Sequence, residues 1–315
     1  MKNIKEIYSG KSGRAFFITC IGEKFYKIFF KIALQYYLPY CKKYDIGIIL
    51  ISDFIDQNYK AHKLYEDNPG LQRLLGPEEI RKNFPKYKFI CDIDSDCIPG
   101  YSSRNIFDFC KNPKKNEIYL VKLVPEKQTR ADLGKKISLL RRLYQNKNYP
   151  LDSLMAASDF EESKIFRNTY KGPFATIGTC IGSTETLADT GLEIYRKIIT
   201  KKNFMYLQNY RIDYYNRYLN LKWLPYEFQA LWNFEVSINY PFLFHKNFKK
   251  NYYECVMATL HKVDFLHFAG SGIENLIYTD MNYKKKGKLR KYYSFILKYL
   301  KMNVKIKSYG KIKLK

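Results

Sequence analysis

The stretch Phe89-Ile90-Cys91-Asp92-Ile93-Asp94-Ser95-Asp96-Cys97-Ile98-Pro99-Gly100 decides the fold prediction. Its apolar start predicts a buried strand, and Pro99-Gly100 predicts the turn that ends it. Asp92, Asp94 and Asp96 stand at alternate positions, so in an extended strand their side chains would lie on one face. Three carboxylates on one face repel one another, and burying them unpaired costs several kcal/mol each.

A divalent cation with oxygen ligands, Mg²⁺ or Mn²⁺, would remove this repulsion. Such ions commonly hold phosphate oxygens at their open positions. The pattern therefore predicts a metal–diphosphate site at the carboxyl end of a central strand. The structural alternative is a polar strand end, in which the aspartates cap a helix or bind basic side chains.

Apolar segments before this stretch predict an alternating α/β fold. Residues 15–21 and 45–52 are typical of buried strands, and apolar side chains at helical spacing over residues 26–37 predict a helix between them. Strand, helix, strand is a βαβ unit, whose right-handed crossover implies parallel strands. The strand ends, residues 19–22 and 52–53, would then share one crevice, where open α/β sheets bind ligands.

Further elements are expected downstream. Strands are predicted over residues 118–124 and 172–183, a third strand ends at residues 222–225, and a short strand runs into a glycine turn over residues 265–272; helices are predicted over residues 184–199 and 207–219. The charged segment of about 126–171 predicts a helical insertion or lid. We therefore expect one α/β domain over residues 1–275, with a mostly parallel central sheet flanked by helices, and a separate basic helical tail over residues 276–315.

Composition argues against a disordered or disulfide-stabilised chain. The 315 residues are 46% hydrophobic, which is enough for a sizeable core. The seven cysteines are scattered, with no CxxC pair and no zinc spacing, which predicts reduced core thiols in a cytoplasmic protein. Residues 1–14 show no signal peptide, and no apolar run is long enough to span a bilayer.

The net charge of +25 predicts anionic partners: nucleic acid, an anionic membrane or phosphorylated substrates. Residues 284–315 hold 13 Lys or Arg and no acid, about half of the excess. Apolar side chains share one helical face here: Leu289, Tyr293, Ile296, Leu297 and Leu300. A basic amphipathic helix predicts binding to an anionic membrane surface, and the alternative is a solvated helix with a disordered end.

The order of these segments resembles nucleotide-sugar glycosyltransferases of the GT-A fold, and the resemblance covers most of residues 15–272. Ile93-Asp94-Ser95-Asp96 is similar to the DxD motif of those enzymes, in which the first aspartate contacts the ribose or the metal and the second binds the metal. The preferred register pairs Asp94 with Asp96, and a register of Asp92 with Asp94 remains open. Residues 18–22 with Tyr26 are similar to the nucleotide-binding start of the family.

The segment Leu266-His267-Phe268-Ala269-Gly270 is similar to the terminal His-Phe-x-Gly of glycosyltransferase family 8. In those retaining enzymes the histidine is a metal ligand and the glycine turn lies against the diphosphate. The resemblance therefore implies a Mn²⁺ or Mg²⁺ site made of Asp94, Asp96 and His267. A satisfied core histidine is the structural alternative for His267. Together these motifs place eight residues at the donor nucleotide: Thr19, Cys20, Ile21, Tyr26, Asp53, Asp94, Ser95 and Gly270.

One motif departs from the family 8 pattern. Asp213-Tyr-Tyr-Asn216 falls where those enzymes have Asp-Gln-Asp-x-x-Asn, and Arg211-Ile212 replaces the leading Asp-Gln. Those positions line the sugar in the family, so retaining and inverting stereochemistry both stay open. Asp213 and Glu227 are the acids of the expected acceptor region and the candidate catalytic carboxylates. For Asp213, a helix-surface residue is the alternative.

We therefore expect a metal-dependent glycosyltransferase that moves a sugar from a nucleotide-sugar, with UDP-sugar favoured, to a saccharide or lipid-linked saccharide. Charge and resemblance together favour bacterial surface polysaccharide, lipooligosaccharide or capsule synthesis at the cytoplasmic face of the inner membrane. A metal-dependent nuclease or nucleotidyltransferase would use the same aspartates with two metals. No recognised nucleic-acid motif precedes the acidic strand, so no nucleic-acid partner is expected. A non-catalytic basic membrane adaptor would leave the aspartate triplet unexplained.

Overall fold

The computed structural model describes residues 3–57, 69–110, 114–143, 175–199, 207–244, 251–269 and 273. The chain divides into two compact units. The first unit combines Met1–Ser95, Asn105–Leu123 and Phe160–Pro225, and the second combines Asp96–Arg104, Val124–Asp159 and Tyr226–Lys315. The chain thus passes from the first unit to the second within the acidic stretch, between Ser95 and Asp96.

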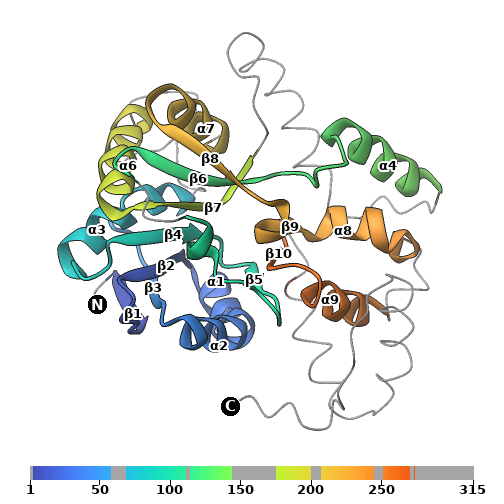
Figure 1. Cartoon of the computed structure of the whole chain (residues 1–315), viewed down its shortest axis with the longest axis horizontal. Helices are drawn as coiled ribbons and strands as arrows, with labels where there is room; N and C mark the ends of the chain where they lie inside the picture. The colour runs from blue at the N-terminus through green and yellow to red at the C-terminus, as the bar shows by residue number, and fades with distance from the viewer. Residues whose placement is uncertain are drawn as a thin grey trace. The chain divides into compact units, whose positions relative to one another are not determined.

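A seven-stranded sheet forms the centre of the first unit (Figure 1). In spatial order its strands are β1 (Ile4–Tyr8), β3 (Gly47–Ile51), β2 (Arg14–Thr19), β4 (Phe89–Ile93), β7 (Ala175–Ser183), β6 (Glu117–Lys122) and β8 (Asn220–Leu224). Three neighbouring pairs are parallel and three are antiparallel. The predicted α/β class is confirmed. The sheet is mostly parallel, as predicted: β3, β2, β4, β6 and β8 run in one direction, and β1 and β7 run opposite to them.

The predicted βαβ unit is confirmed. Strands β2 and β3 are parallel, and the connection between them contains α1 (Glu23–Ile28), the π-helical turn η1 (Phe29–Ala33) and α2 (Leu34–Tyr44). In register, Thr19 lies opposite Ile51, and Ile18 lies opposite Ile93 of β4. The carboxyl ends of β2, β3 and β4 therefore meet at one edge of the sheet.

Helices cover both faces of this sheet. On one face, η3 (Pro69–Leu74), α3 (Gly76–Asn83) and α6 (Thr184–Ile199) bury apolar side chains against β2 and β3. The packing at Gly76 is close, because a Cβ at this position would lie 2.5 Å from Cδ1 of Ile51. On the other face, the rings of Tyr37 and Tyr40 from α2 contact the Phe16 ring at 5.6 and 5.8 Å. The helix α7 (Leu207–Tyr218) lies against β7 and β8, and η4 (Ile106–Phe109) also belongs to this unit.

The second unit contains a three-stranded sheet of short strands. They are β5 (Cys97–Pro99), β10 (Phe265–His267) and β9 (Ala230–Leu231). The central strand β10 pairs antiparallel with β5 and parallel with β9. Its helical elements are α4 (Arg130–Leu143), η5 (Tyr226–Gln229), α8 (Trp232–Asn239), η6 (Pro241–Phe244) and α9 (Tyr252–Leu260). Only glycine fits at the turn after β5, because a Cβ on Gly100 would lie 2.3 Å from the Val263 carbonyl oxygen.

Some predicted segments fall outside the described residues. Of the predicted insertion at about 126–171, the part beyond residue 143 lies outside them, and so do the predicted tail over residues 276–315 and Gly270. Within the part of the chain that is described, no helix has the length and apolar character needed to cross a membrane.

Candidate active site

The turn between β4 and β5 carries the predicted metal ligands. The strand β4 ends at Ile93, so Asp94 and Asp96 lie beyond it and strand alternation does not set their directions. The backbone N–H of Asp94 donates to the Gly178 carbonyl at 2.8 Å, and the Asp96 carbonyl accepts from the Phe268 N–H at 3.0 Å. The prediction that three aspartates share one strand face is therefore wrong, because the strand is too short to contain all three.

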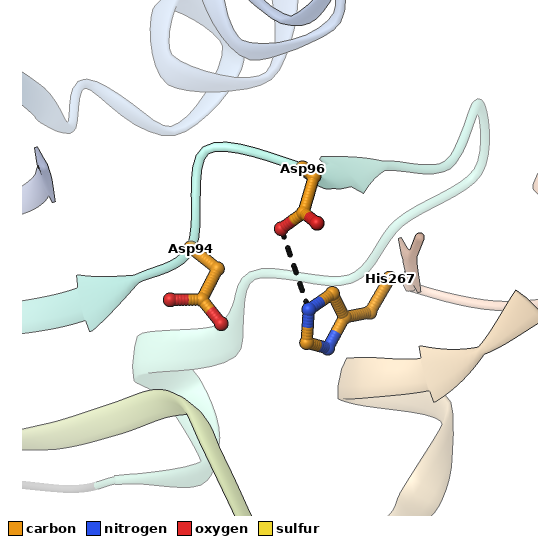
Figure 2. A group of neighbouring side chains, drawn as sticks. All are labelled: Asp94, Asp96 and His267. Carbon is orange, nitrogen blue, oxygen red and sulfur yellow. Dashed lines mark ion pairs between the residues drawn. The ribbon is translucent and has the colours of Figure 1, made fainter. Parts of the chain in front are cut away.

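Asp96 and His267 form a pair within the second unit. Nε2 of His267 lies 3.3 Å from Oδ1 of Asp96, and the histidine is 4% exposed (Figure 2). The other ring nitrogen, Nδ1, lies 2.9 Å from Nε2 of Gln229. An amide N–H that donates to Nδ1 leaves the ring proton on Nε2, which faces Asp96. A cation bound at Nε2 requires the proton on Nδ1 instead, and after an amide flip Oε1 of Gln229 can accept a hydrogen bond from Nδ1–H.

Asp94 completes a group with the donor set of a divalent metal site. Asp94, Asp96 and His267 each offer one ligand atom, and these atoms lie within 4.8 Å of one another (Figure 2). Only Ser95 separates the two aspartates, so the covalent chain holds both carboxylates on one turn. Two carboxylates and an imidazole suit Mn²⁺, and the carboxylates also suit Mg²⁺. The residues present therefore fit the predicted cation.

Asp92 has a different environment from the other two aspartates. It is 1% exposed and accepts hydrogen bonds from Nε and Nη2 of Arg73 at 2.7–3.0 Å. Its Oδ2 also accepts from Nη2 of Arg211 at 2.9 Å. Two guanidinium groups therefore bind this carboxylate, which makes Asp94 with Asp96 the register that is compatible with metal binding. For Asp92, the structural alternative, in which an aspartate binds basic side chains, is confirmed.

Arg73 connects Asp92 to the metal-site turn. Its Nη1 donates to Oδ1 of Asp94 at 2.6 Å, while Nε and Nη2 hold Asp92. Burial by itself would lower the pKa of Arg73, and the carboxylates of Asp92 and Asp94 more than offset burial, so its pKa is raised. The guanidinium thus stays charged and is shared between two carboxylates.

Arg211 is the second cation of this cluster. It is 3% exposed and also donates to the Tyr215 hydroxyl at 3.1–3.2 Å. Burial opposes its charge, but Tyr215 and Asp92 outweigh burial and raise the pKa of Arg211. Cys180 lies opposite Asp92 in the β4–β7 register, and burial raises the pKa of its thiol to about 12. Asp92 and Arg211 are therefore charged and buried, whereas Asp94 at the other end of the cluster stays partly exposed.

Several predicted donor residues lie at the shared edge of β2, β3 and β4. Thr19 is the last residue of β2, and the Cys20 N–H donates to the Ile51 carbonyl at 2.8 Å. Ile21 is buried, and Asp53 is exposed with its Oδ1 accepting from the Phe54 N–H at 2.8 Å. This arrangement agrees with the prediction that the ends of the first two strands share one edge.

Tyr26 and Ser95 complete the described donor candidates. Tyr26 lies on α1, is 36% exposed and packs against Phe30, with ring centroids 4.6 Å apart and ring planes tilted by 43°. Ser95 lies on the turn between Asp94 and Asp96.

The two candidate catalytic acids lie in different units. Asp213, on α7 of the first unit, accepts from Nε of Arg217 at 3.0 Å, and its side chain is 18% exposed. Glu227, on η5 of the second unit, is exposed, and its backbone carbonyl accepts from the Asp264 N–H at 2.9 Å.

Sequence reasoning missed Arg73 and Gln229 and noted Arg211 only as a departure from a motif. Arg73 lies in a polar segment without a recognisable pattern, and Gln229 lies where a loop is expected. Two features of the sequence could have indicated the buried charged cluster: a basic residue, Arg211, at a motif position where the family has an acid, and an acidic residue, Asp92, beyond the two that the DxD motif needs.

No protein-family model and no curated protein matches the sequence. Among solved structures, the chain is similar to a glycosyltransferase involved in glycosylation of the major capsid of PBCV-1, with a TM-score of 0.50 and 10% identity over 85% of this chain and 98% of that one. It also matches the bifunctional WbbM glycosyltransferase in its apo form (TM-score 0.48, 12% identity, 94% of this chain and 52% of that one). A third match is the galactosyltransferase LgtC in complex with donor and acceptor sugar analogues (TM-score 0.39, 11% identity, 87% of this chain and 98% of that one). The chain has the fold of GT-A glycosyltransferases.

Proposed function

We propose that this protein is a metal-dependent glycosyltransferase that moves a sugar from a nucleotide-sugar to a saccharide acceptor. The observation that carries the proposal is the group of Asp94, Asp96 and His267, on the turn after the central strand β4 of a GT-A sheet. Open α/β sheets bind ligands at the carboxyl ends of their strands, which is where this group lies.

In this proposal Asp94, Asp96 and His267 hold Mn²⁺ or Mg²⁺. The cation supplies Lewis-acid stabilisation of the negative charge that develops on the leaving diphosphate. Gln229 fixes the orientation of the imidazole through Nδ1 and selects which ring nitrogen carries the proton. His267 is 4% exposed, so the packing around it limits the orientations that the ring can adopt.

The donor nucleotide is proposed to bind along the edge formed by β2, β3 and β4. Thr19, Cys20 and Ile21 line the end of β2, and Oγ1 of Thr19 is a buried hydroxyl with no hydrogen-bond partner in the described part of the chain. A bound ribose or phosphate would satisfy that hydroxyl. The exposed ring of Tyr26 offers a flat surface for a base. Asp53, Ser95 and Gly270 are the remaining proposed donor contacts, with a UDP-sugar favoured.

Sugar transfer breaks the bond between the anomeric carbon and the diphosphate oxygen and forms one from that carbon to the acceptor oxygen. In an inverting reaction the acceptor proton passes to a carboxylate, for which Asp213 and Glu227 are the candidates. In a retaining reaction by front-side attack the proton passes to the leaving diphosphate. Asp213 is bound by Arg217, whereas Glu227 is exposed, and proton NMR of the product anomer distinguishes the two stereochemical courses.

A donor panel tests the proposal. Thermal unfolding of the full chain is measured with UDP-, GDP- and CMP-sugars, with and without Mn²⁺, because a ligand of the native state raises the unfolding temperature. We expect a metal-dependent rise with one nucleotide, and release of the free nucleotide on prolonged incubation. Asp96→Asn is expected to lose both responses while remaining folded.

The matched control is Asp189→Asn. Asp189 is an exposed aspartate on α6 that pairs with Arg81, and its replacement is expected to leave both responses unchanged. Wild-type responses in Asp96→Asn would refute the metal site. A stabilising shift with an oligonucleotide, and with none of the nucleotide-sugars, would replace the proposal with a nucleic-acid enzyme.

We further propose that the acceptor is lipid-linked, in bacterial surface polysaccharide, lipooligosaccharide or capsule synthesis, and that residues 276–315 bind the cytoplasmic face of the inner membrane. The excess of basic residues in that segment supports this proposal. Deletion of residues 284–315 should abolish co-sedimentation with anionic vesicles and preserve hydrolysis of a soluble donor. Unchanged vesicle binding would refute the proposed role of the tail.

A further inference from the structure

The charged cluster around Asp92 is more elaborate than a metal site requires. Two aspartates, Asp92 and Asp94, and two arginines, Arg73 and Arg211, are connected by hydrogen bonds of 2.6–3.0 Å. All four belong to the first unit. Two of these groups, Asp92 and Arg211, are at most 3% exposed, so bulk water screens their charges weakly.

The connections run in one chain. Arg211 binds Oδ2 of Asp92, Asp92 binds Nε and Nη2 of Arg73, and Nη1 of Arg73 binds Oδ1 of Asp94. A carboxylate has two oxygens, so Asp94 can accept from Arg73 at one and bind a cation with the other. Two side chains, those of Asp92 and Arg73, therefore connect Arg211 by hydrogen bonds to Asp94, a proposed metal ligand.

The charges of this chain cancel. Two guanidinium groups balance two carboxylates, so the cluster contributes no net attraction for a cation. Without Arg211 the cluster would carry one net negative charge, and without Asp92 it would carry one net positive charge. Arg211 has no direct contact with Asp94, and its described partners are Asp92 and Tyr215.

We propose that Arg211 and Asp92 are an opposed pair of positioning residues that set the affinity of the metal site: Arg211 weakens cation binding at Asp94, and Asp92 strengthens it. The inference rests on the metal site of the proposed function. Its consequence is a site that takes up the cation weakly on its own and more strongly with an anionic diphosphate.

The test is the affinity of the full chain for Mn²⁺ alone, measured by calorimetric titration and by the electron paramagnetic resonance signal of free Mn²⁺. Arg211→Gln is expected to bind Mn²⁺ about tenfold more tightly than wild type, and Asp92→Asn about tenfold more weakly, the order of effect of one weakly screened charge. The double variant Asp92→Asn/Arg211→Gln restores neutrality and is expected to return close to the wild-type affinity.

The matched control is Arg217→Gln. Arg217 lies on the same helix, α7, but its side chain is 53% exposed and binds Asp213, so the Mn²⁺ affinity is expected to stay unchanged. Should Asp92→Asn fail to fold, Arg211→Gln and the double variant still decide the question through the direction of the change.

The outcomes separate the two proposals. Absence of Mn²⁺ binding in wild type would overturn the metal site itself. Binding in wild type together with weaker or unchanged binding in Arg211→Gln would overturn this inference alone, because a merely structural role predicts that every variant weakens binding. Opposite shifts in the two single variants would establish it.

Discussion

Replacement of Asp92 by asparagine should destabilise the first unit more than any surface charge change. The wild-type carboxylate is 1% exposed and binds two arginines. Asparagine has nearly the same shape, but it is neutral and turns one acceptor oxygen into an N–H donor. That donor would face a guanidinium donor, and Arg211 would lose the one carboxylate among its described partners, while Arg73 would keep only Asp94.

The magnitude follows from what each arginine retains. Removing one partner of a buried ion pair typically costs about 3–5 kcal/mol, because an uncompensated charge stays buried. Arg73 keeps Asp94 at 2.6 Å, and Arg211 keeps the Tyr215 hydroxyl at 3.1 Å. These remaining contacts place the expected loss at the lower end, about 3 kcal/mol in the free energy of unfolding.

Urea denaturation at pH 7 can measure this loss in the first unit alone. The chain has two tryptophans, Trp223 on β8 of the first unit and Trp232 on α8 of the second. In a Trp232→Phe background, fluorescence therefore follows the first unit. We expect a lower transition midpoint with an unchanged slope, the signature of lost stability without a change in the surface exposed on unfolding.

Asp189→Asn in the same background is the control. Asp189 pairs with Arg81 at 2.8 Å, and the two side chains are 57% and 39% exposed. Exposed pairs of this kind contribute about 0–1 kcal/mol. Equal losses in Asp92→Asn and Asp189→Asn would refute the argument that burial and shared arginines make the Asp92 network a large stabilising element.

Three further predictions concern other parts of the fold. Gly191→Ala on α6 should lower the free energy of unfolding, measured by urea denaturation, by about 1–3 kcal/mol, because the new Cβ would lie 2.2 Å from the Leu74 carbonyl oxygen. A gain in stability, which is the usual effect of this change at an open helix position, would contradict the prediction. Burial lowers the pKa of His261 below 6.5 in the folded state, so the unfolded chain binds this proton more readily. The free energy of unfolding should therefore fall as the pH is lowered through 6.5. His261→Gln should flatten that dependence, and parallel curves of unfolding free energy against pH in the two proteins would exclude His261 as its cause. Asp264→Asn should cost about 2 kcal/mol in the second unit, since Asp264 accepts from the Arg104 side chain and backbone N–H, and an unchanged melting temperature would show that this contact contributes nothing.

Local patterns predicted the parts of the fold that depend on local burial. The apolar runs correspond to β2, β3 and β4, and the helical spacing over residues 184–199 corresponds to α6 with the same bounds. The helix before β3 continues past Pro39 to Tyr44, because the following residue, Asp45, supplies the left-handed C-cap at φ 56°. The helix thus ends at this cap and not at the proline.

Features set by distant parts of the chain were not predictable. The strand β1 (Ile4–Tyr8) is a half-buried edge strand with Lys5 and Glu6 in its middle, so its sequence lacks an apolar run. The strands β5 and β9 have three and two residues and exist through their pairing with β10, which is distant from both along the chain. The antiparallel entry of β7 between β4 and β6 leaves no local signal either, because strand order is a property of the tertiary structure.

The same division applies to the candidate site. The aspartates and His267 were predicted because the turn and the His-Phe-x-Gly segment resemble known motifs, and the structure places their ligand atoms within 4.8 Å. Arg73 was not predicted, because it reaches Asp92 and Asp94 from 19 and 21 positions away, and Arg211 reaches Asp92 from 119 positions away. A basic residue at such a distance has no periodic pattern that could associate it with the site.

Repulsion among the three carboxylates is only partly left unbalanced in the structure. Arg73 and Arg211 neutralise the repulsion between Asp92 and Asp94, so a cation is not needed there. With a neutral imidazole at His267, the three carboxylates and two guanidinium groups leave one net negative charge. A bound divalent cation would turn this into one net positive charge, which is complementary to a diphosphate. In the proposed function, the need for a cation would therefore come from the diphosphate, because Arg73 and Arg211 already neutralise Asp92 and Asp94.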